Sequence, residues 1–82
     1  LILTKEEYED RAFEGIKDFK FVIAKNLKTV SSYQFYRSSS QFLFMPKVEI
    51  IANSTFEFCP LTAVCFLKVK SIGDYAFQGC KN

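Results

Sequence analysis

The segment Ile72-Gly-Asp-Tyr-Ala-Phe-Gln-Gly-Cys80 occurs, in weaker form, three more times along this 82-residue chain. The other copies are Tyr8-Glu-Asp-Arg-Ala-Phe-Glu-Gly-Ile16, Val30-Ser-Ser-Tyr-Gln-Phe-Tyr-Arg-Ser38 and Ile51-Ala-Asn-Ser-Thr-Phe-Glu-Phe-Cys59. Their central residues follow one another at intervals of 22, 21 and 21 residues: Phe13, Phe35, Phe56 and Phe77. A fixed period of this length indicates a solenoid, in which each repeat forms one turn and stacks on its neighbours.

The residues between these segments keep the same register. Four further columns of three residues each are apolar throughout, namely Phe21/Phe42/Ala63, Ile23/Phe44/Cys65, Leu27/Val48/Val69 and Val30/Ile51/Ile72. Parallel strands lie about 4.8 Å apart, so each column is expected to form a continuous apolar rib. The central Phe residues are then spaced so that their rings stack as a ladder.

Short runs rich in Val, Phe and Leu predict three parallel strands. These runs are Lys20–Ile23, Gln41–Met45 and Thr62–Phe66. The segments around the central Phe residues are expected to be single helical turns on the returning arcs. Thr4 with Glu7 is a capping-box pattern, and Tyr8, Ala12 and Ile16 recur at helical spacing. Residues 5–17 are therefore expected to be a first repeat with a helical arc, with a separate capping helix as the alternative.

The last copy resembles the BspA-type leucine-rich repeats, in which Ile-Gly-x-x-Ala-Phe-x-x-Cys precedes a Leu and a short strand. The third copy keeps Ile51, Phe56 and Cys59 of this pattern, and the first two are degenerate. The resemblance implies a right-handed, horseshoe-like coil of short parallel strands. It also implies a surface protein of the kind linked to adhesion in microbes and protists.

Composition excludes several classes of protein. Hydrophobic residues make up 49% and charged residues 24% of the chain, which fits a packed domain. The net charge is only +2 and the basic residues are scattered, so a nucleic-acid partner is not expected. No apolar run approaches the ~20 residues of a membrane-spanning helix. With three Cys and no His, neither a Cys/His metal centre nor a nucleophile with an imidazole base is available. We expect neither an enzyme nor a cofactor.

Alternation along the predicted strands suggests a partner-binding face. It assigns the Phe21/Phe42/Ala63 and Ile23/Phe44/Cys65 columns to the interior. It directs Val22, Leu43 and Val64 outward, with Met45 and Phe66 close by, as an apolar ridge that a protein partner could bind.

Two further features bear on the cellular location of the protein. Cys59 and Cys80 occupy one column in adjacent turns, and we favour buried thiols there over a disulfide. Asn53-Ser-Thr55 is an acceptor sequence for N-glycosylation at a predicted bend.

These features together predict one leucine-rich-repeat domain over residues 1–82, acting as a non-catalytic protein-binding or adhesion scaffold. A cell-surface or extracellular location is favoured, and a cytoplasmic interaction scaffold of the same fold is the alternative. The chain begins without Met and ends at Asn82, so we interpret it as part of a longer array. Its C-terminal end then lacks a capping repeat, and self-association through that end is expected.

Overall fold

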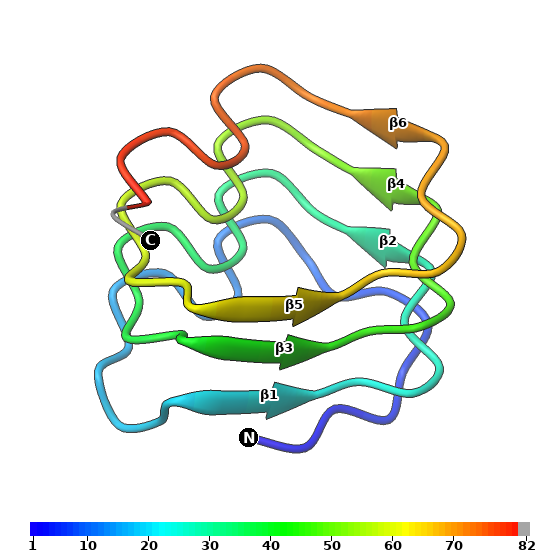
Figure 1. Cartoon of the computed structure of the whole chain (residues 1–82), viewed down its shortest axis with the longest axis horizontal. Helices are drawn as coiled ribbons and strands as arrows, with labels where there is room; N and C mark the ends of the chain where they lie inside the picture. Colours follow the sequence, from blue (N-terminus) through cyan, green and yellow to red (C-terminus); the bar gives the residue numbers. More distant parts are fainter. Residues whose placement is uncertain (81–82) are drawn as a thin grey trace.

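The chain winds into a short coil, in which each repeat forms one turn (Figure 1). The computed structural model describes residues 1–80. One parallel sheet has the order β1-β3-β5, with strands β1 (Phe21–Ile23), β3 (Phe42–Phe44) and β5 (Ala63–Cys65). A second parallel sheet has the order β2-β4-β6, with strands β2 (Thr29–Val30), β4 (Ile50–Ile51) and β6 (Ser71–Ile72).

The register of both sheets follows the repeat period. Phe21 pairs with Phe42, and Phe42 pairs with Ala63 one turn further on. The predicted parallel strands are therefore confirmed, at positions within the expected runs. The second sheet was foreseen only as the apolar column that contains Val30 and Ile51. Its strands are two residues long, too short for a periodic pattern to reveal.

The core is built around the predicted phenylalanine ladder. The ring of Phe35 lies 5.3 Å from those of both Phe13 and Phe56, and Phe77 continues the stack 5.6 Å beyond Phe56. All three contacts are stacked, and the two central rings are fully buried. Leucine and valine columns fill the rest of each turn, with Leu27, Val30, Val48 and Ile51 buried beside the rings. The core thus runs continuously from turn to turn.

The arcs around the ladder contain no helix anywhere in residues 1–80, so the predicted helical turns are wrong. The Phe13 N–H donates to the carbonyl of Gln34 in the next turn, at 2.8 Å. The following N–H, of Glu14, instead donates back to the Arg11 carbonyl at 3.1 Å. Backbone donors therefore alternate between the neighbouring turn and their own arc.

This alternation depends on residues with left-handed backbone conformation. They recur in two columns, Arg11/Tyr33/Ser54/Tyr75 and Gly15/Arg37/Phe58/Gly79, with φ between 56° and 75°. An α-helix needs an unbroken series of negative φ values, and these residues interrupt it twice in each turn. The arcs are consequently successive β-turns.

The N-terminal residues join the first sheet in place of a cap. The Leu3 N–H donates to the Ile23 carbonyl, and the Ile23 N–H donates to the Leu1 carbonyl, both at 2.8 Å. Ile2 accordingly forms a parallel bridge with Ile23. Residues 5–17 form the first repeat, as favoured, but neither its helical arc nor the alternative capping helix exists.

Candidate protein-binding face

In the first sheet, the side chains predicted to face outward face the interior instead. Val22 is only 1% exposed and Leu43 is also buried, so neither faces outward. Met45 is fully buried, and Phe66 is half-buried against the core. Val64 points inward with them but is 46% exposed, because no described residue covers β5 on its far side. The ridge predicted from these five residues is therefore not a surface ridge.

The inversion has a packing cause. Each strand is apolar at every position, as in Phe21-Val22-Ile23, so alternation alone does not identify the buried side. The interior is already occupied by the phenylalanine ladder, and Val22 and Leu43 belong to the same buried cluster. The bulkier Phe21 and Phe42 rings therefore pack against each other on the outside of the sheet.

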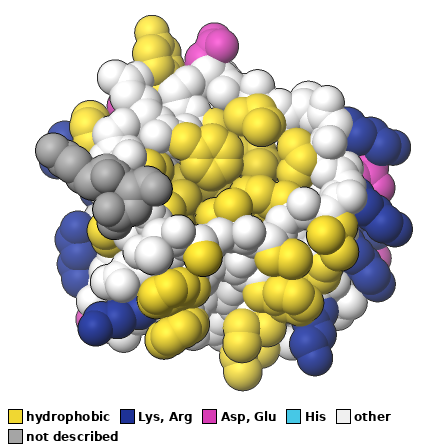
Figure 2. All heavy atoms as spheres, in the orientation of Figure 1, with side chains coloured by type: hydrophobic (Ala, Val, Ile, Leu, Met, Phe, Trp, Pro, Cys, Tyr) yellow, Lys and Arg dark blue, Asp and Glu magenta, His cyan; other side chains and the backbone are white. Residues whose placement is uncertain are grey.

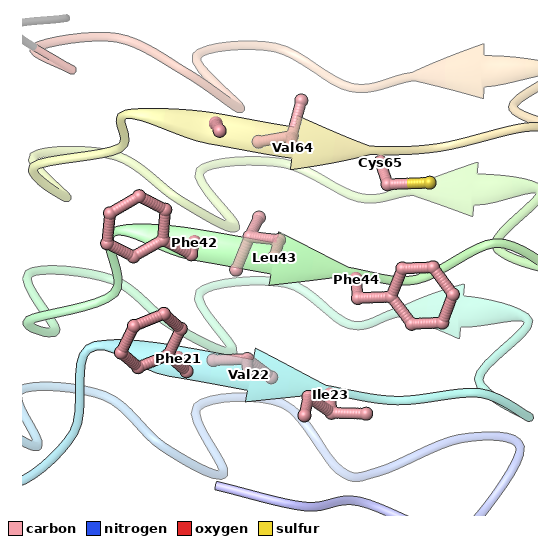
Figure 3. Close-up of a pocket in the computed structure, with 9 residues that line it drawn as sticks. Phe21, Val22, Ile23, Phe42, Leu43, Phe44, Val64 and Cys65 are labelled. Carbon is pink, nitrogen blue, oxygen red and sulfur yellow. The ribbon is translucent and has the colours of Figure 1, made fainter.

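Two apolar columns stand on the outer face of the β1-β3-β5 sheet. One starts with Phe21 and Phe42, whose rings are stacked with centroids 4.8 Å apart and planes 17° from parallel. The other contains Ile23, Phe44 and Cys65 (Figure 3). Phe21 is 58% exposed and Phe44 is 42% exposed. We call these two columns and the strip between them the sheet-face groove.

The sheet-face groove is shallow and apolar. Its volume is about 320 Å³, and every lining side chain is uncharged. Figure 2 shows hydrophobic side chains on both sides of a strip of backbone where the sheet lies, with Lys and Arg side chains around the rim. Exposed lysines follow the strands at the corners of successive turns, Lys25, Lys47 and Lys68. The face is therefore an apolar strip bordered by positive charge.

The cysteines have separate environments, and all three are free thiols. The Cys59 thiol donates to the Phe35 carbonyl at 2.9 Å, and the Cys80 thiol donates to the Phe56 carbonyl at 3.2 Å. Each thus satisfies a carbonyl of the preceding turn. Burial raises the pKa of Cys59, an effect that the Ser38 hydroxyl partly offsets by hydrogen bonding, and burial also raises the pKa of Cys80. Cys65 instead lies in the sheet-face groove.

Asn53 is exposed, but its surroundings are tightly organised. Its side-chain oxygen accepts a hydrogen bond from the Asp74 N–H at 2.8 Å, next to Gly73. A β-carbon on Gly73 would approach that oxygen to 2.4 Å, so only glycine fits there. The hydroxyl of Thr55 is buried and donates to the Ala52 carbonyl at 2.7 Å. Glycosylation of Asn53 would therefore have to precede folding of this turn.

Residues 1–80 contain neither a cluster of potential metal ligands nor a helix long and apolar enough to span a membrane. Between residues 1 and 80, no group of three or more His, Cys, Asp or Glu side chains is arranged to hold a metal ion. Over the same range, the structure has no helix that could traverse a lipid bilayer.

Short parallel strands stacked in two sheets, with one turn per 21-residue repeat, define a leucine-rich-repeat solenoid. A family model described as "BspA type Leucine rich repeat region (6 copies)" matches residues 4–82. The chain belongs to this family. Searches with this chain found no match among the curated proteins or the solved structures.

Proposed function

We propose that this chain is a non-catalytic module that binds a protein partner on the outer face of the β1-β3-β5 sheet. The supporting observation is the exposed stack of Phe21 and Phe42 facing Phe44 across the sheet-face groove. Exposed aromatic clusters are unusual on monomeric proteins and are enriched among residues that dominate binding energy. These rings lie outside the buried core cluster, which is on the opposite side of the sheet.

Family membership supports a setting in adhesion at a cell surface. In that setting the lysines at the rim favour a partner with acidic residues around an apolar centre, since opposite charges steer the encounter. An intracellular interaction scaffold of the same fold would use the same face. Surface labelling of intact cells that produce the protein separates these two settings.

The face can be tested with a peptide library displayed on phage and selected against the purified domain. Phe44→Ser should reduce the affinity of the selected peptides by at least about tenfold, the effect of losing one interface hot spot. Ile50→Ser is a matched control, since Ile50 is 46% exposed, close to the 42% of Phe44, but lies in the other sheet. Peptides that tolerate Phe44→Ser and lose binding with Ile50→Ser would place the binding face elsewhere.

A further inference from the structure

On the outer face of the first sheet, the column of aromatic rings ends at β3 and does not continue onto β5. Phe21 and Phe42 are stacked, and the residue paired with Phe42 in the next strand is Ala63. In the described part of the chain, Phe21 is the only ring stacked on Phe42. The other face of the Phe42 ring therefore looks across the exposed methyl group of Ala63.

In the other outer column, the side chain on β5 is also smaller than the one on β3. Ile23 and Phe44 are followed by Cys65, so β5 carries small side chains on both sides of the groove where β3 carries two Phe rings. Figure 3 shows Phe42 and Phe44 flanking Leu43, with Cys65 as the smaller neighbour of Phe44 on the next strand. The groove is therefore wider at β5, where the small side chains of Ala63 and Cys65 lie next to the Phe42 and Phe44 rings of β3. We call this wider part the step over Ala63.

The geometry of this step selects its occupant. Successive strands are about 4.8 Å apart, so a ring placed over Ala63 would meet Phe42 at the spacing at which Phe21 already does. Offset stacking at this distance stabilises an aromatic pair beyond simple burial of apolar area. The lining side chains are uncharged and apolar, so an ionised group would find no partner among them.

We propose that the step over Ala63 receives an aromatic side chain of the docked partner, which completes the Phe21–Phe42 stack as a third ring. The proposal rests on the proposed function, because it specifies what the partner inserts into the sheet-face groove. It predicts that phenylalanine, tyrosine or tryptophan recurs at one position in peptides that bind this face.

A direct test uses N-acetyl-phenylalanine amide as the probe and methyl NMR of the alanines as the readout. The probe should move the Ala63 methyl resonance upfield through the ring current, and should leave the buried Ala24 methyl unchanged. N-acetyl-leucine amide should give a much smaller shift at Ala63. Because Ala63 is exposed, Ala63→Phe should fold normally, fill the step and abolish the response. Ile50→Phe adds the same ring to the other sheet and should leave the response intact.

Equal Ala63 shifts from the two probes, or no shift at all, would overturn the proposal. The same holds if Ala63→Phe leaves the response to the aromatic probe unchanged. The proposed function fails separately, when selected peptides are insensitive to Phe44→Ser. Peptides that are sensitive to that substitution but contain no recurrent aromatic residue would refute only the third ring.

Discussion

The rings of Phe35 and Phe56 lie 5.3 Å apart and only 9° from parallel, although one full repeat separates them in the sequence. Both are completely buried. One turn of the coil therefore advances the chain by a single strand spacing, and the ladder reports the register of the whole solenoid. Any change at these positions affects two interfaces between turns at once.

Phe56→Ala should lower the free energy of unfolding by about 3–5 kcal/mol, because it removes buried apolar area and leaves a cavity between two rings. A small domain has a total stability of only about 5 kcal/mol, so the variant should be largely unfolded at room temperature. Urea unfolding followed by circular dichroism measures the change. Ile50→Ala, at an exposed apolar position, should cost far less. An unchanged urea midpoint for Phe56→Ala would contradict the buried ladder.

Two glycines allow backbone strain and steric clash to be separated. Gly15 and Gly79 have φ values of 71° and 75°, but a β-carbon meets nothing within 4 Å at Gly15. At Gly79 it would come within 2.3 Å of the Phe58 ring. Gly15→Ala should therefore cost about 1 kcal/mol from strain alone, while Gly79→Ala adds roughly 1–3 kcal/mol from the clash.

Thermal unfolding of the two glycine variants measures this difference. In a Phe58→Ala background the ring is absent, and Gly79→Ala should then cost no more than Gly15→Ala. Equal costs in the unmodified background would show that Phe58 does not lie over Gly79.

The buried thiol column predicts a loss of stability at alkaline pH. Burial raises the pKa of Cys59 in the folded state, so the fold favours the protonated thiol. This contribution is complete below about pH 8.5, the ordinary thiol pKa, and is lost as the pH rises toward the raised value. The urea midpoint should therefore fall as the pH rises above about 8.5, and Cys59→Ala should flatten this decline. A slope that Cys59→Ala leaves unchanged would assign the effect to other groups.

The 82-residue polypeptide should self-associate through its β5 end. Val64 is an inward-facing residue that is half-exposed there, and β5 pairs only with β3 in the described part of the chain. Open sheet edges beside apolar side chains invite pairing with a second chain. Sedimentation velocity over a roughly hundredfold concentration range should show association, which Val64→Lys should weaken. A monomer at every concentration would contradict this expectation.

Much of the fold could be predicted from the sequence, because stacking turns impose a period that survives in the residues. The spacing of Phe13, Phe35 and Phe56 located the ladder, and the strands followed at fixed distances from it. The arcs were not predicted, because their left-handed positions are occupied by residues such as Arg37 and Phe58 as well as by glycine. Neither left-handed position carries one residue type in all four repeats.

The apolar face predicted to bind a partner was placed on the wrong side of the sheet for a different reason. The apolar columns were identified correctly, but the side of the sheet to which each belongs was not. That choice depends on the space left inside each turn by Phe35 and Leu27, a property of three-dimensional packing that alternation along Phe21-Val22-Ile23 does not encode. The step over Ala63 could be found only after the side was known.

The ladder of hydrogen bonds between turns also determines how the molecule responds to mechanical force. Strands run across the axis of the coil, so the bonds that link Phe21–Ile23 to Phe42–Phe44 lie along that axis. Tension between the two ends of the coil therefore acts on one turn at a time, and each turn that peels away releases 21 residues, about 70 Å of extended chain. A contact built from such coils would yield in discrete steps and absorb work before it detached.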